Sequence, residues 1–195
     1  MNLKLLWYCT KSDLKLYKTI DNDYTVKKAK DNIFGYEELN GKIVAESDFN
    51  VINIYGNINK DNQPYYEAHS WCLFHEDWIT EKSRLNHDQL VKYLGAYKGL
   101  VGHAIYIKDL EIFKEPRELS DFYTYDDSYD NMFGCFFEDR EKYIPLKNAP
   151  QNMCYAYDKY GNKYVVISTH PEWLCLILNG LKDVELRRKV LKEML

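Results

Sequence analysis

Residues 164–188, YVVISTHPEWLCLILNGLKDVELRR, carry the hydrophobic pattern that most constrains the fold of this chain. Lys163 to Thr169 predicts a strand, because the segment is short and rich in β-branched residues. Glu172 to Leu178 predicts an apolar helix that Pro171 opens and a glycine turn ends, and Asp183 to Arg187 alternates as a second strand. An apolar helix between two strands needs a sheet to pack against, which indicates an α+β fold with a curved or barrel-like sheet.

The glycine turn after this helix leads into three charged side chains, Lys182, Glu185 and Arg187. On a strand, Glu185 and Arg187 share a face because side chains alternate with a period of two. A carboxylate among cations beside a helix end is suited to binding a phosphate or the edge of a base. The other interpretation of this spacing is a surface strand on which Glu185 and Arg187 form a solvated ion pair.

Short apolar segments predict most of the remaining elements. We expect strands at residues 3–10, 42–49, 51–55, 104–107, 110–113 and 153–157. We expect a helix at Asn86–Leu94, which Asn86 can cap and Gly95 can end. Residues 59–66 predict a polar loop, and residues 69–78 fit either a helix or a strand. The length of 195 residues suits one domain with a real hydrophobic core.

The charge of the chain limits the nucleic acids that it could bind. The formal net charge is −4, whereas non-specific binding to phosphate needs concentrated Lys and Arg. Residues 111–143 hold ten acidic and four basic side chains, so the rest of the chain is modestly basic. The tail from Lys182 to Leu195 has five basic and three acidic residues. This pattern is compatible with a single nucleotide or a small patch of RNA and excludes a long duplex.

Several classes of protein are excluded by composition and motifs. No apolar run approaches the roughly 18 residues of a membrane span, and the N-terminus has no signal-peptide pattern. The five cysteines are an odd number without a C-x-x-C pair, which indicates neither a disulfide framework nor a zinc site. His69 and His75 have no metal-ligand spacing, and no phosphate-binding or dinucleotide-binding glycine motif occurs. We therefore expect a cytoplasmic protein without a metal, a cofactor or a membrane partner.

The segment Gly180 to Arg187 resembles the Gly-x-Lys-x-x-Glu-x-Arg signature of ASCH domains, small barrels related to PUA domains. Other segments resemble the ASCH proteins of phages and prophages, and together they cover most of the chain: residues 6–11, 41–46, 104–113, 116–119 and 149–155. The resemblance implies one PUA-like domain over residues 1–195, with a small curved barrel and flanking helices.

The order of these segments differs from the order in the family. Residues 163–195 correspond to the family's N-terminal segment, and residues 1–157 correspond to the remainder. We therefore interpret the chain as a circular permutant of the ASCH fold, with the old termini joined near Gly161. This interpretation predicts a hairpin between the strands on either side of Gly161, and new chain ends that lie close together.

The resemblance implies a cleft that binds RNA or a modified nucleobase or nucleotide. The candidate ligand-binding residues are Tyr8, Lys11, His170, Lys182, Glu185, Arg187 and Arg188. Some ASCH domains are hydrolases, so a nucleoside amidohydrolase or a ribonuclease is an alternative, with Lys182, Glu185 and Glu46 as acid/base candidates. The amidohydrolase pattern has a Thr soon after the lysine, whereas Asp183 and Val184 stand here and neither supplies a hydroxyl nucleophile.

An acidic, tyrosine-rich arm at residues 120–145 suggests a third function. In this interpretation the chain is a phage factor that contacts a host enzyme or defence complex through residues 120–142 as a mimic of nucleic acid. The aromatic side chains Trp7, Trp71 and Trp78 could stack on bases, but we expect most of them in the core, because aromatic residues supply much of the buried area.

Overall fold

Residues 3–11, 39–125 and 143–195 are described by the computed structural model, and the chain forms two compact units. Unit 1 combines residues 1–47 with residues 110–175, and unit 2 combines residues 48–109 with residues 176–195. Each unit draws on two separate stretches, so pairing between distant segments builds both. Gly161, where the circular permutation predicts that the old termini are joined, lies in unit 1. The expectation of one domain over residues 1–195 stays a prediction.

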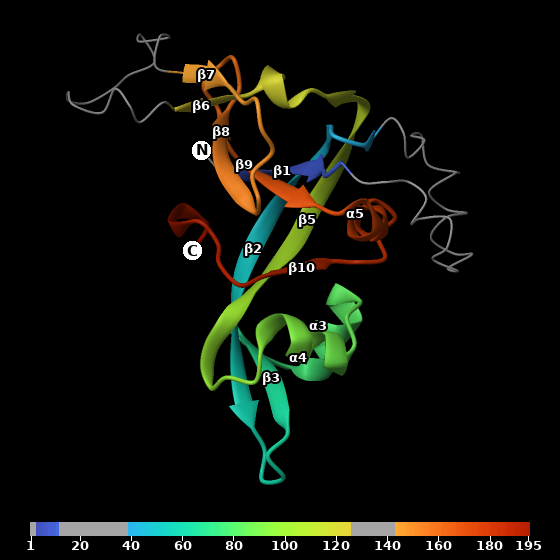
Figure 1. Ribbon diagram of the computed structural model, residues 1–195, viewed down its shortest axis with the longest axis vertical. Coiled ribbons are helices and arrows are strands. Elements are labelled where there is room, and N and C mark those ends of the chain that lie inside the picture. The colour runs from blue at the N-terminus through green and yellow to red at the C-terminus, as the bar shows by residue number, and fades with distance from the viewer. Residues whose placement is uncertain (1–2, 12–38, 126–142) are drawn as a thin grey trace, which may run out of the picture. The chain divides into compact units, whose positions relative to one another are not determined.

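Unit 1 is built on a mixed sheet in the strand order β2-β1-β9-β8-β6-β7. Its strands are β1 (Lys4–Cys9), the first part of β2 (Ile43–Ile58), β6 (Tyr123–Tyr125), β7 (Tyr143–Pro145), β8 (Met153–Tyr157) and β9 (Lys163–Thr169), labelled in Figure 1. β1 runs parallel to β9, whereas β1 and β2 are antiparallel, as are β8 and β9. β1 is buried from Leu5 to Cys9, as a central strand covered on both faces is.

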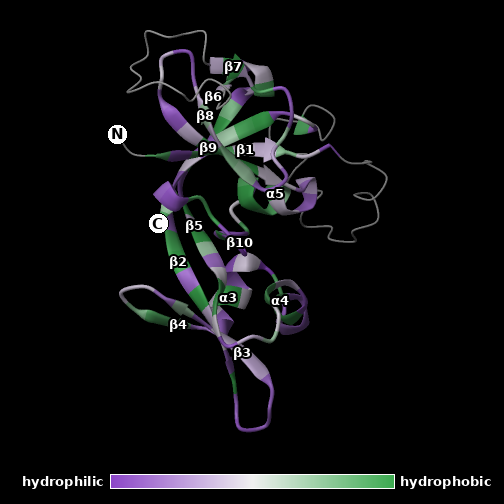
Figure 2. Ribbon diagram, turned by 60° about the vertical axis from the view of Figure 1, so that its left-hand side comes forward, coloured by the Kyte–Doolittle hydropathy of each residue, from purple (hydrophilic) through white to green (hydrophobic). Residues whose placement is uncertain are grey.

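Alternate residues of β1 face two different apolar layers. Tyr8 belongs to a core cluster with Leu119, Phe122 and Leu146. Trp7 is fully buried, and its indole Nε1 donates to Ser47 Oγ at 2.9 Å, so this ring is part of the core as expected. Figure 2 shows the hydrophobic colouring of β9, which lies beside β1.

Unit 2 packs two helices on one face of a second group of strands. The strand order is β10-β5-β2-β3-β4. The elements are the second part of β2, β3 (Pro64–His69), β4 (Leu73–His75), α3 (Glu76–Ser83), α4 (His87–Leu94), the first part of β5 (Gly99–Arg117) and β10 (Val184–Arg187). Ile79 of α3 and Leu90 of α4 are fully buried against Ile54, Ala104 and Val184 of the strands.

The predicted helix at residues 86–94 is confirmed together with its cap. The Asn86 side chain accepts from the Gln89 backbone N–H, and the Gln89 side chain accepts from the Asn86 backbone N–H, both at 2.9 Å. This reciprocal pair satisfies N–H groups that the first helical turn leaves without partners. Gly95 ends the helix with a φ of 86°, a conformation that glycine adopts without strain.

The other predicted elements are largely confirmed. The strands at β1, β2, β8, β9 and β10 and the apolar helix α5 (Pro171–Leu178) occur where the sequence pattern predicts them. The loop predicted at residues 59–66 is too long, because β3 begins at Pro64. Residues 69–78 contain the end of β3, β4 and the start of α3, so neither single interpretation holds.

The two strands predicted at residues 104–107 and 110–113 are one strand, β5. Asp109 stands between them with a φ of 46°, in the left-handed region that L-residues rarely adopt. This local distortion, which separates two apolar segments, explains why the hydrophobic pattern predicts two strands.

The hairpin that the permutation requires is confirmed. β8 and β9 pair antiparallel from Met153–Ile167 to Tyr157–Lys163, with Gly161 in the turn. Met1 lies outside the described residues, so the proximity of the chain ends stays a prediction. In the part of the chain that the structure describes, the sheet is not closed into a barrel, so the PUA-like barrel also stays a prediction. No helix of this part is long and apolar enough to cross a membrane.

Candidate functional site

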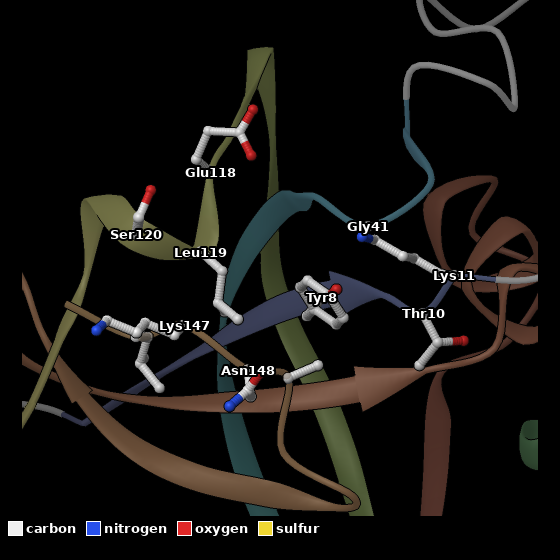
Figure 3. A pocket seen from close by; sticks show the side chains of 11 residues that line it. Tyr8, Thr10, Lys11, Gly41, Glu118, Leu119, Ser120, Lys147 and Asn148 are labelled. Atoms are coloured by element: carbon white, nitrogen blue, oxygen red, sulfur yellow. The ribbon is translucent and has the colours of Figure 1, made fainter.

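Unit 1 contains a pocket of about 480 Å³ at the end of β1. Its walls come from three parts of the chain: the β1 end with Gly41, residues 118–120, and residues 146–149. The backbone N–H of Leu146 donates to the Phe122 carbonyl at 2.8 Å, which ties the second and third parts together. Two of the predicted ligand-binding residues, Tyr8 and Lys11, line this pocket (Figure 3).

The floor of the pocket is apolar and its rim is polar. Tyr8, Leu119 and Leu146 line it and are 4%, 8% and 7% exposed, because they also belong to the unit 1 core. Figure 3 shows the Tyr8 ring between Leu119 and Lys11. Because little of the Tyr8 ring is exposed, the floor offers a small apolar contact area rather than an open ring face.

Two hydroxyl groups in the pocket have no hydrogen-bond partner among the described residues. One is Tyr8, whose pKa is raised by burial and by the neighbouring Cys9. The other is Thr10 Oγ1, which is buried. Buried polar groups are nearly always hydrogen-bonded, and leaving one unpaired costs about 1–3 kcal/mol. Thr10 Oγ1 has almost no accessible surface, so the hydroxyl that a ligand in the pocket can reach is that of Tyr8.

Lys11 reaches the pocket by crossing over Gly41. A Cβ on residue 41 would lie 2.9 Å from Lys11 Cε, so a larger residue would make the flexible end of the lysine side chain shift. Gly41 also has a φ of 78°, and its N–H donates to the Cys9 carbonyl at 2.8 Å. Two independent requirements, backbone conformation and space, therefore favour glycine at this position.

The pocket carries an excess of positive charge. Lys11 and Lys147 line it and make no ion pair with another described residue. The single acidic lining residue, Glu118, is paired with Lys42. In a chain with a net charge of −4, this local excess of cations favours an anionic ligand.

The predicted residues Lys182, Glu185 and Arg187 lie together in unit 2, away from solvent. Lys182 Nζ lies 3.2 Å from Glu185 Oε2, and Arg187 Nη2 lies 2.9 Å from Glu185 Oε1. Their side chains are 3%, 10% and 13% exposed in the order Lys182, Glu185 and Arg187. The alternative of a solvated surface pair is therefore wrong, because the ion pairs are buried.

Lys182 also attaches β10 to the end of α3. Its Nζ donates to the Ser83 carbonyl at 2.9 Å, and burial lowers its pKa while Glu185 opposes that shift. The Asp183 N–H donates to the Lys82 carbonyl at 3.1 Å, which strengthens the same attachment. Both carboxylate oxygens of Glu185 and the Lys182 ammonium are thus engaged inside the protein.

The remaining predicted site residues, Arg188, His170 and Glu46, lie outside both the pocket and the buried cluster. Arg188 donates through Nε to the Tyr93 carbonyl. His170 is exposed, and its backbone carbonyl accepts from the Leu174 N–H at the start of α5. Glu46 lies in unit 1 and pairs with Lys4 at 2.6 Å, whereas Lys182 and Glu185 belong to unit 2. The acid/base set proposed from the sequence stays a prediction.

Thr10, Glu118, Lys147 and Asn148 line the pocket and were missed from the sequence. Thr10 had a signal, because it follows Tyr8 by two residues on an extended chain. The others had none, since pairing between β6 and β7 brings them to the pocket. Of the contact segment predicted at residues 120–142, residues 126–142 lie outside the described residues.

The other aromatic and histidine candidates do not form a site. Trp71 is fully exposed after β3, and Trp78 stacks on Phe74 with ring centroids 4.3 Å apart. No group of three or more potential metal ligands occurs within residues 3–11, 39–125 and 143–195. Comparison of the chain with protein-family models, with curated proteins and with solved structures found no match.

Proposed function

We propose that this protein binds RNA or a modified nucleotide, and that the unit 1 pocket holds one nucleotide. The observation that carries the proposal is the pocket itself: Tyr8 lies in its floor with a hydroxyl that has no hydrogen-bond partner among the described residues, and Lys11 and Lys147 line it without an ion pair among those residues. The residues of the rim and the floor extend this argument.

The pocket offers a complementary group for each part of a nucleotide. Its volume of about 480 Å³ falls within the range of roughly 300–1,000 Å³ that is typical of small-molecule sites. The apolar floor formed by Tyr8 and its leucine neighbours suits the apolar face of a base. Lys11 and Lys147 suit a phosphate, and the Tyr8 hydroxyl suits a polar atom of the base or the sugar.

The size of the pocket favours one nucleotide over a helix. A protein that binds a long duplex neutralises many phosphates with many cations, whereas two lysines line this pocket. The proposal therefore concerns a free nucleotide or an unpaired base of RNA. An ASCH fold, permuted as the segment order suggests, remains part of the proposal.

The hydrolase alternative gains no support from the buried cluster. A general acid or base has to reach its substrate within hydrogen-bond distance. The Lys182 ammonium instead contacts the Ser83 carbonyl and Glu185, and Lys182 is 3% exposed. These contacts support a structural contribution of the cluster in unit 2.

Titration calorimetry with nucleoside monophosphates, inorganic phosphate and a short unpaired RNA tests the proposal. We expect nucleotides to bind and phosphate alone to bind far more weakly, because the base contacts would be lost. Lys11→Ala and Lys147→Ala should each weaken nucleotide binding by roughly tenfold, the range for a charge-assisted hydrogen bond.

The matched control is Lys60→Ala, which removes an exposed lysine of unit 2 outside the pocket. It should leave the affinity unchanged. Absence of nucleotide binding in the wild-type protein, or equal affinities of Lys11→Ala and Lys60→Ala, would overturn the proposal.

A further inference from the structure

Glu118 is the one acidic residue among the residues that line the unit 1 pocket. It directly follows β5 and precedes a short 3-10 helix, Leu119–Asp121. Lys42 of unit 1 contacts its Oε1 atom, and the Glu118 side chain is 56% exposed. Figure 3 shows Glu118 on the same side of the pocket as Ser120.

A carboxylate at the rim of a pocket that attracts anions limits which anionic ligands can bind there. It repels a phosphate, and it can only accept hydrogen bonds when it is ionised. An ionised acceptor at the rim is compatible with a phosphate ligand only if another part of that ligand donates a hydrogen bond to it.

We propose that Glu118 selects nucleotides whose base carries an exocyclic amino group. This inference rests on the proposed function, because it assumes that a nucleotide occupies the pocket. Cytosine, guanine and adenine each present an amino group that can donate to a carboxylate. Uracil carries a carbonyl oxygen where cytosine has its amino group, and hypoxanthine carries one where adenine has its amino group. The lone pairs of that oxygen face those of the carboxylate.

The other polar groups of the pocket are consistent with this selectivity. Asn148, across the pocket floor, carries an amide that can both donate and accept. Its amide can pair with the remaining edge of any of the five bases, so it does not discriminate between them. Discrimination between amino and carbonyl groups therefore depends on Glu118.

The experiment compares two pairs of ligands in which a carbonyl group replaces the amino group: cytidine with uridine monophosphate, and adenosine with inosine monophosphate. We expect the wild-type protein to bind the amino-bearing member of each pair about tenfold more tightly. Glu118→Gln should bring both pairs within about twofold, because an amide can rotate to donate to a carbonyl. Glu118→Ala, which also removes the contact with Lys42, should show the same loss of preference.

Glu111→Gln is the matched control, since it makes the same chemical change at an exposed position of β5 in unit 1 outside the pocket. It should keep the preference of the wild-type protein. Equal binding of both members of each pair by the wild-type protein, or an unchanged preference in Glu118→Gln, overturns the inference and leaves nucleotide binding standing. Absence of binding by all four nucleotides overturns the proposed function and the inference with it.

Discussion

Lys11 crosses Gly41 so closely that a Cβ on residue 41 would lie 2.9 Å from Lys11 Cε. This contact links a glycine of the turn before β2 to a cation of the proposed ligand pocket. Gly41→Ala should therefore displace the lysine and weaken nucleotide binding severalfold. The positive φ of 78° adds a conformational cost of about 1–2 kcal/mol in the free energy of unfolding. Calorimetry and thermal denaturation measure the two effects separately.

Gly99→Ala separates crowding from backbone strain. Gly99 has a φ of 96°, and a Cβ there would meet no atom within 4 Å. The substitution should cost a similar amount of stability and leave nucleotide affinity intact. Equal losses of affinity in the two variants would show that Gly41 acts through stability alone.

Tyr8→Phe removes the unpartnered hydroxyl and keeps the aromatic floor of the pocket. We expect nucleotide affinity to fall by roughly tenfold, as for a lost hydrogen bond in a desolvated site. Stability without ligand should not fall, because no described residue bonds to this hydroxyl. Tyr160→Phe, at a 77% exposed ring, is the control and should change neither quantity.

The pH dependence of binding provides a second check on Tyr8. Burial raises the pKa of this phenol above its ordinary value of 10.0. The hydroxyl consequently stays protonated, and able to donate, throughout the range from pH 6 to about pH 9. A loss of affinity in that range that disappears in Tyr8→Phe would contradict this assignment.

Local signals predicted the elements of the fold, and distant pairing decided the site. The Asn86 cap and the apolar run of β1 act within a few residues, so both could be predicted from the sequence. Tyr8 and Lys11 were predicted from the resemblance of residues 6–11 to ASCH proteins. Glu118 and Lys147 were not, since their place depends on the pairing of β6 with β7.

The burial of the cluster formed by Lys182, Glu185 and Arg187 could not be predicted from the spacing of these residues either. The alternation of Glu185 and Arg187 correctly placed them on one face of a strand. Whether that face meets water depends on the residues that cover it, and Ser83 of α3 is 99 positions away from Lys182. A surface pair and a buried pair therefore share the same sequence pattern.

Lys182→Met should strongly destabilise the protein. The substitution leaves Glu185 buried without one of its two cations, and it leaves the Ser83 carbonyl without its donor. Breaking a buried ion pair typically costs about 3–5 kcal/mol in the free energy of unfolding. Urea denaturation measures this quantity.

Lys82→Met is the control for that prediction. Lys82 pairs with Asp183 at 3.1 Å, but the two side chains are 31% and 40% exposed. Exposed pairs contribute about 0–1 kcal/mol, so the loss should be small. Similar losses in the two variants would refute a special contribution of the buried cluster.

Cys9 should make the stability of the protein fall at alkaline pH. Burial raises the pKa of this thiol from 9.0 to about 12, and the nearby Cys175 contributes to the shift. Between these values the unfolded chain loses the proton and the folded chain keeps it, so rising pH favours unfolding. The loss amounts to about 1.4 kcal/mol per pH unit near the middle of this interval.

Cys9→Ala should flatten the decline of the unfolding free energy above pH 9, whereas Cys72→Ala, at an exposed thiol, should leave it unchanged. Identical slopes in the wild-type protein and Cys9→Ala would exclude this thiol as the source.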